Sequence, residues 1–86
     1  MIVIFHNFFR KKLKKFNKKE QVLIESRLKI FAQDSNNFVL NNHALHGKYF
    51  GCGSINISGD LRAIYKMQDN NIALFVDIDN HSNLYK

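Results

Sequence analysis

The chain has 86 residues, of which 45% are apolar, and a formal net charge of +6. A chain of this size forms one domain with one core, and no apolar run approaches the roughly 20 residues of a membrane span. The single cysteine, Cys52, excludes an intrachain disulfide framework and suits a reducing compartment. The opening MIVIF is too short for a signal peptide, so we expect a cytoplasmic protein that begins with a strand.

The positive charge is concentrated in the first part of the chain. Residues 1–34 hold nine Lys and Arg against three acidic residues, whereas residues 35–86 are neutral overall. Such a block favours a polyanion or an acidic protein as partner, and the alternative is an ordinary solvated helix surface.

A helical hairpin is predicted after a first strand at residues 2–6. Asn7 is suited to cap a first helix with an apolar stripe opposite its lysines. Asn17 and Glu20 form a capping-box signal for a second helix that runs to about Gln33. The stripe of the first helix is Phe9, Leu13 and Phe16, and the buried face of the second is Ile24, Leu28 and Phe31.

The second part of the chain predicts an antiparallel sheet. Residues 35–53 form a polar, Asn-rich connection in which FVL and HALHG can dock on the core. Three strand patterns follow, at 54–58, 61–66 and 71–78, with tight turns at 58–60 and 69–71. We therefore predict a single α+β domain over residues 1–86, with the order β-α-α-β-β-β and a helical hairpin on a small, mostly antiparallel sheet.

Metal and nucleotide sites are disfavoured by the sequence. His43, His46, Cys52 and His81 are the candidate metal ligands, but no CxxC or HExxH pairing supports them. The glycines of GKYFGCG have the wrong spacing for a phosphate loop. We expect neither a metal nor a cofactor.

A second constellation fits metal-free cleavage of RNA. The reaction needs a base for the 2′-hydroxyl, an acid for the leaving 5′-oxygen and a cation for the phosphate. Imidazole titrates in the useful range, arginine binds phosphate with two hydrogen bonds, and tyrosine can stack on a base. Each residue also has a purely structural explanation in a turn, loop or tail. The candidates are His43, Asp60, Arg62, His81 and Tyr85.

Three stretches carry a resemblance to a known family: NNHALHGKYFG, SINISGDLRAIYK and FVDIDNHSNLY. Together they resemble the RelE/ParE superfamily of bacterial toxins, and most closely its RelE/YafQ-type messenger-RNA interferases. They span about residues 41–85, and GDLRAIYK followed by H-x-x-L-Y is their most specific part. The N-terminal helices match only in pattern.

The resemblance implies a toxin of a type II toxin–antitoxin module that cleaves messenger RNA in the ribosomal A site. Cleavage by 2′-hydroxyl attack would leave a cyclic phosphate. The implied partners are the ribosome, messenger RNA and a cognate acidic antitoxin. In the family's motifs, His43, Asp60, Arg62, His81 and Tyr85 match the functional positions. The lysines expected to contact RNA or the ribosome are Lys11, Lys12, Lys15, Lys18, Lys19, Lys48 and Lys66.

Two positions depart from what the resemblance implies. YafQ-like members usually have a second histidine at the position of Asn56 and often an arginine at that of Asp77. Both departures remove cationic or titratable groups and leave the acid and base roles open. Two rival functions therefore remain: a ParE-like inhibitor of DNA gyrase, and a member that only binds its antitoxin or RNA.

Overall fold

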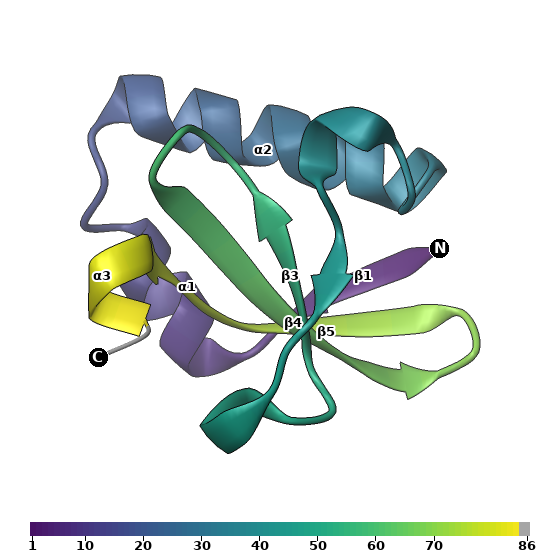
Figure 1. The fold of residues 1–86 in the computed structure, drawn as a ribbon. Coiled ribbons are helices and arrows are strands. Elements are labelled where there is room, and N and C mark those ends of the chain that lie inside the picture. Colours follow the sequence, from purple (N-terminus) through teal and green to yellow (C-terminus); the bar gives the residue numbers. More distant parts are fainter. Residues whose placement is uncertain (85–86) are drawn as a thin grey trace.

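The computed structural model describes residues 1–84, which form one five-stranded sheet with helices packed against it (Figure 1). The strand order is β1-β5-β4-β3-β2; β1 is parallel to β5, and the other neighbours are antiparallel. The predicted α+β fold with a helical hairpin is thus confirmed. The elements are β1 (Ile2–Phe5), α1 (Asn7–Leu13), α2 (Lys18–Gln33), the 3-10 turn η1 (Phe38–Leu40), β2 (His43–Ala44), η2 (Gly47–Tyr49), β3 (Gly53–Asn56), β4 (Leu61–Asp69), β5 (Ile72–Asn80) and α3 (His81–Leu84).

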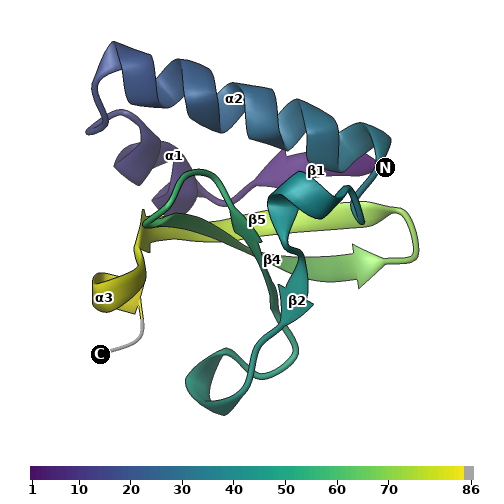
Figure 2. The same ribbon diagram turned by 45° about the horizontal axis from the view of Figure 1, so that its top comes forward.

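Apolar clusters cover both faces of the sheet. Ala63 and Ile64 of β4 are both fully buried, but they point to opposite faces because side chains alternate along a strand. The larger cluster lies against α1 and α2, and the smaller one lies on the side of η2 and α3 (Figure 2). The larger is formed by Phe9, Ile24, Leu28, Phe31, Leu40, Ile55, Ile57, Leu61, Ala63, Ala73, Phe75 and Ile78, and the smaller by Leu45, Ile64 and Leu84.

Phe75 of β5 connects both long helices to the sheet. Its ring makes edge contacts with Phe9 of α1 and Phe31 of α2, at centroid distances of 5.8 and 5.2 Å. All three rings are fully buried, and each contributes about 1.5–3 kcal/mol by leaving water. The predicted apolar faces of the two helices therefore meet on one strand.

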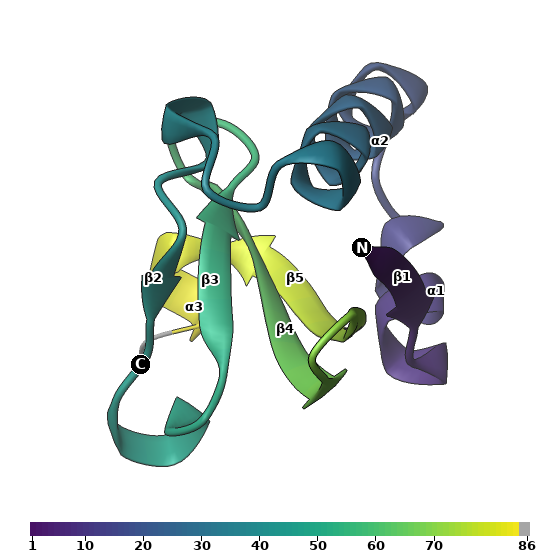
Figure 3. The ribbon, with the colours of Figure 1, turned by 90° about the vertical axis from the view of Figure 1, so that its right-hand side faces the viewer.

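Helix α1 follows directly after β1 and lies beside β5. The His6 amide donates a hydrogen bond to the Phe75 carbonyl (2.9 Å), after which the chain turns into α1. Strand β1 and helix α1 consequently lie together at one side of the sheet, next to β5 (Figure 3). This placement brings the side chains of α1 within reach of the second half of β5.

The helix starts are partly as predicted. Asn17 and Glu20 make the predicted capping box at the start of α2, with both reciprocal hydrogen bonds, and α2 ends at Gln33. The predicted cap at Asn7 is wrong by one residue: His6 is the N-cap, and its Nδ1 accepts from the Phe8 amide (3.1 Å). An imidazole nitrogen therefore takes the place of the carboxamide or hydroxyl that usually caps a helix. Because His6 is the cap, β1 ends at Phe5, one residue earlier than predicted. No helix in residues 1–84 is long and apolar enough to cross a membrane.

The connection between α2 and β3 has more order than its sequence predicts. Leu40 of η1 is buried in the larger cluster and Leu45 in the smaller one, so FVL and HALHG both dock on the core, as predicted. The two-residue strand β2 pairs with β3 and places His43 opposite Ser54. A strand this short leaves no periodic signal in the sequence.

Gly53 lies beneath the ring of Tyr65, its partner across β3 and β4. A Cβ at Gly53 would lie 2.5 Å from Tyr65 Cζ. The ring cannot easily move, because it packs on Phe31 (4.8 Å between centroids) and its hydroxyl donates to Asn42 Oδ1 (2.7 Å). The absence of a side chain at this position is therefore needed for packing.

We expect Gly53→Ala to lower the free energy of unfolding by about 1–3 kcal/mol, because the added methyl group overpacks this contact. The matched control is Gly59→Ala, where a Cβ meets no atom within 4 Å of the described structure and should change stability by less than about 0.5 kcal/mol. Urea unfolding of both variants measures the difference. Equal stabilities would show that the Tyr65 ring moves aside at no cost.

Candidate active site

An open cleft of about 460 Å³ lies on the face of the sheet that carries α3. Three of the five predicted catalytic residues, His43, Arg62 and His81, line it. They come from β2, β4 and α3, and the pairing of β2 with β3 and of β3 with β4 brings the first two together. The complete lining is Asn41, His43, Ala44, Leu45, His46, Arg62 and His81.

The turn between β3 and β4 holds Arg62 and His81 through consecutive carbonyl groups. The Arg62 guanidinium donates to the carbonyls of Ser58 (2.9 Å) and Gly59 (3.2 Å). The next carbonyl, that of Asp60, accepts from the backbone amide of His81 (2.8 Å). One tight turn thus fixes both the arginine head group and the start of the helix that carries the histidine.

Arg62 keeps a donor for a ligand. Its third hydrogen bond is to the Leu61 carbonyl, so all of its bonds within residues 1–84 use the two terminal nitrogens. The Nε–H group is left for a phosphate oxygen, and a guanidinium can use Nε and one terminal nitrogen as a fork. Among the described residues Arg62 makes no ion pair with Asp60, and its partners are backbone carbonyls.

The orientation of His43 identifies the nitrogen that can act on a substrate. Its Nδ1 is 2.8 Å from the carbonyl oxygen of Asn41. Because a carbonyl only accepts, Nδ1 must carry a proton, and in the neutral ring Nε2 is then the unprotonated nitrogen. Asn41 has a left-handed backbone (φ 44°), the conformation in which this carbonyl meets the ring.

His46 also lines the cleft, and the sequence reasoning considered it only as a metal ligand. The HALH sequence could have indicated that His46 lies near His43, since the two histidines stand on either side of the Ala44-Leu45 pair and Leu45 is buried in the smaller cluster. Among residues 1–84, no group of three or more His, Cys, Asp or Glu side chains is arranged to hold a metal ion.

Two predicted catalytic residues are not placed in the cleft. Asp60 is exposed and is not part of its lining; what it contributes is its backbone carbonyl, bonded to His81. Tyr85 lies outside the described residues.

Most of the lysines predicted to contact RNA are exposed. Lys48 lies over the ring of Tyr49, with its Nζ 5.1 Å from the centroid. Lys12 differs from the others because it is half-buried and paired with carboxylates. The exposed ones are Lys11, Lys15, Lys18, Lys19, Lys48 and Lys66.

Comparison with known proteins identifies the family. Residues 2–86 match the family model described as the bacterial toxin of type II toxin–antitoxin systems, YafQ. The chain belongs to the YafQ toxin family. No curated protein matches it in sequence.

Solved structures agree with the fold of this YafQ-family chain. YafQ from E. coli strain BL21(DE3) superposes with a TM-score of 0.80 at 16% identity, covering 98% of this chain and 97% of the other. The YoeB/ParE toxin from Agrobacterium tumefaciens gives a TM-score of 0.76 at 12% identity, covering 94% and 99%. The toxin fold is thus kept where little sequence is shared.

Asn56, where the resemblance implies a histidine, lies beside Arg62 across β3 and β4. Its Oδ1 is buried and has no hydrogen-bond partner among residues 1–84. This YafQ-family chain therefore has a polar but non-titratable group next to its arginine. An amide does not titrate near neutral pH, so Asn56 itself cannot take up or release a proton there.

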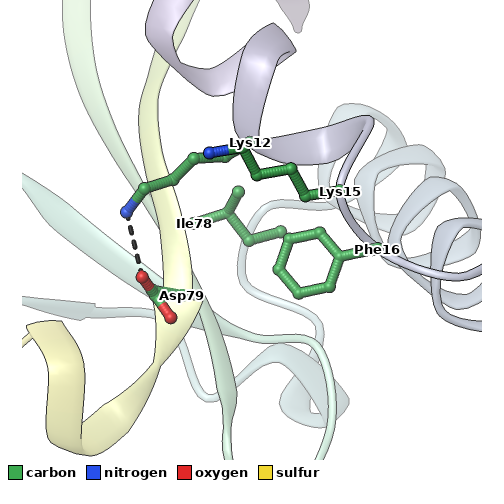
Figure 4. Close-up of a pocket in the computed structure, with 5 residues that line it drawn as sticks. All are labelled: Lys12, Lys15, Phe16, Ile78 and Asp79. Atoms are coloured by element: carbon green, nitrogen blue, oxygen red, sulfur yellow. Dashed lines mark hydrogen bonds and ion pairs between the residues drawn. The ribbon is translucent and has the colours of Figure 1, made fainter.

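Asp77, where the resemblance implies an arginine, belongs to a three-charge group with Lys12 and Asp79. Lys12 Nζ lies 2.8 Å from Asp77 Oδ1 and 3.0 Å from Asp79 Oδ2. Figure 4 shows Lys12 extending from α1 to Asp79, above a pocket of about 220 Å³ that Lys15, Phe16 and Ile78 also line. The sequence does not predict this group, because Lys12 is 65 and 67 residues away from its two partners.

The contacts of this group stabilise the charged forms of Lys12 and Asp79. Burial by itself would lower the pKa of Lys12, but the hydrogen bonds and attraction from Asp77 and Asp79 outweigh it and raise that pKa above its ordinary value. Burial would likewise raise the pKa of Asp79, but hydrogen bonds from Asn83, Lys12 and the Asn80 amide lower it instead. Lys12 and Asp79 therefore both remain charged at neutral pH.

Proposed function

We propose that this YafQ-family toxin is an endoribonuclease that cleaves messenger RNA, on the ribosome and in the cytoplasm. The observation that supports this most is the cleft that gathers His43, Arg62 and His81 from three separate elements. It contains two imidazoles for proton transfer and one guanidinium for the phosphate, which are the groups that metal-free RNA cleavage requires.

In the proposed reaction, one imidazole takes the proton of the 2′-hydroxyl while its oxygen attacks the adjacent phosphorus. The bond from phosphorus to the 5′-oxygen breaks, the second imidazole protonates that oxygen, and the products are a 2′,3′-cyclic phosphate and a 5′-hydroxyl. Arg62 stabilises the charge that develops on the phosphate through its remaining donors. His81 is the leading candidate for one proton transfer, and His43 supplies the other through Nε2.

Asp60 and Tyr85 have supporting roles in this proposal. Asp60 positions His81 through its carbonyl, and its exposed carboxylate can orient a substrate group at the rim. Tyr85 would stack on a base, as an aromatic ring next to a splayed nucleotide does. The exposed lysines of α1 and α2 would contact ribosomal RNA, whose phosphates attract a basic surface from any sequence.

Inhibition of DNA gyrase is the second candidate function, because the fold also superposes on a toxin named YoeB/ParE. A protein that only binds gyrase has no need of two histidines and an arginine in one cleft. The cleft therefore favours the nuclease.

Induced expression of the chain should arrest growth and produce new transcript ends without DNA breaks. The matched control is Arg62→Ala, which we expect to abolish the arrest because no other arginine or lysine lines the cleft among the described residues. Arg62→Lys should retain only part of it, since an ammonium lacks the planar fork. DNA breaks without transcript cleavage would overturn the nuclease and support the gyrase inhibitor.

His81→Ala should slow messenger-RNA cleavage on ribosomes by about 10²–10⁴-fold, the usual contribution of one proton-transfer group. Ribosome binding should be largely kept, because the basic helices provide the electrostatic attraction. Ser82→Ala, one residue further along α3, is the control for disturbance of the helix. Parental rates for His81→Ala together with loss of activity in His43→Ala would assign the proton transfer to the loop histidine alone.

A cognate acidic antitoxin is the proposed regulatory partner. This chain is similar in fold to a chain of the E. coli DinJ–YafQ toxin–antitoxin complex, at 17% identity, and to a chain of the YoeB–YefM complex from Staphylococcus aureus, at 21% identity. The basic surface of residues 1–34 fits an acidic, amphipathic segment that becomes ordered on binding.

We expect the association rate constant of this complex to fall by about tenfold or more between low salt and about 1 M salt, where charges are screened beyond roughly 3 Å. Stopped-flow mixing of toxin with antitoxin measures it. An association rate that does not depend on salt would show that the basic surface is not the docking site.

A further inference from the structure

Helix α3, which carries His81, is too short to hold its own position. It has four residues, His81–Leu84, whereas isolated helices shorter than about 12 residues are marginal in water. Contacts with the rest of the molecule must therefore hold it. At its start the His81 amide is bonded to the Asp60 carbonyl, and at its end Leu84 is buried against the sheet.

A third contact runs through the carboxylate of Asp79. Its Oδ1 accepts from the Asn83 side-chain amide (3.0 Å) and from the Asn80 backbone amide (2.8 Å). Its other oxygen, Oδ2, accepts from Lys12 Nζ (3.0 Å). One carboxylate thus connects α1 to α3 across the end of β5.

Lys12 offsets the repulsion between Asp79 and the neighbouring carboxylate of Asp77. Asp77 and Asp79 are two residues apart on one strand, so their side chains lie on the same face. Their exposed fractions are only 14% and 27%, which limits screening of their repulsion by solvent. Without the ammonium between them, the like charges would separate and Asp79 would turn away from Asn83.

We propose that Lys12 is a positioning residue of the active site, which holds α3 and His81 through Asp79 and Asn83. The effect on cleavage rests on the proposed nuclease function, whereas the effect on α3 does not. Lys12 and the two aspartates sum to a formal charge of −1, so the group as a whole does not attract phosphate. Lys12 therefore acts on turnover and does not serve as an RNA contact.

The test compares Lys12→Met with Lys14→Met. Lys14 lies at the end of the same helix, is exposed and has no described side-chain contact, so both variants lose one positive charge from one helix. In the protein without RNA, NMR should show loss of order in residues 81–84 and a shifted Asn83 side-chain amide for Lys12→Met alone. In ribosomal cleavage, kcat should fall on the order of tenfold or more, as for other small misplacements of a catalytic group, with KM unchanged.

Two further variants make the outcome decisive. Lys12→Arg keeps the cation and should restore both readouts. Asn83→Ala removes only the link from Asp79 to α3 at an exposed position, so it should fold normally and loosen α3 with the Lys12 bridge intact. The proposal is overturned if Lys12→Met leaves α3 ordered, or if it raises KM as the loss of an RNA contact would. Absence of cleavage by the parent protein would refute the nuclease, and the NMR comparison would still decide the role of Lys12.

Discussion

Three consecutive backbone carbonyls at the β3–β4 turn, those of Ser58, Gly59 and Asp60, are the constraint on which the cleft depends. The first two hold the Arg62 guanidinium, and the third holds the amide of His81. An exposed arginine otherwise loses about 2 kcal/mol of side-chain entropy when a ligand fixes it. Because the turn has already ordered this side chain, a phosphate in the proposed reaction would bind to a preformed group. In the proposed nuclease, the polar turn between β3 and β4 would therefore have a role that apolar strands could not provide.

The face that carries the cleft is divided electrostatically. His43, His46, Arg62 and His81 lie on the side formed by β2, β4 and α3. On the β5 side, two carboxylates are held by one lysine, and that region is negative overall. In the proposed nuclease, an RNA strand would be attracted by the first region and not by the second, so the charge pattern would restrict the path of the phosphates to the side where the histidines lie. The basic surface of α1 and α2 is a separate feature that can attract ribosomal RNA or an acidic partner from a distance.

How well the sequence predicts each element depends on the range of the interactions that form it. The capping box of α2 and the apolar stripes of both helices are local signals, and the structure confirms them. The sequence predicts Asn7 as the cap of α1, but His6 provides it, because residue preferences do not distinguish an imidazole cap. Strand β2 and helix α3 have two and four residues, too few to show a period. Both are held by tertiary contacts, and both carry residues of the cleft.

The sequence by itself determined the order of the two longer helices and of four of the five strands, the α+β class, the core positions and the motifs by which the chain resembles RelE/YafQ-type toxins, because each of these depends on local pattern. Only the tertiary structure decided which candidates meet. It brought His43, Arg62 and His81 into one cleft with His46, and left the side chain of Asp60 outside it. It also paired Lys12, one of the lysines expected to contact RNA, with Asp77, 65 residues away. Such pairs depend on strand register and on the packing of α1 beside β5, and no local pattern in the chain specifies either of them.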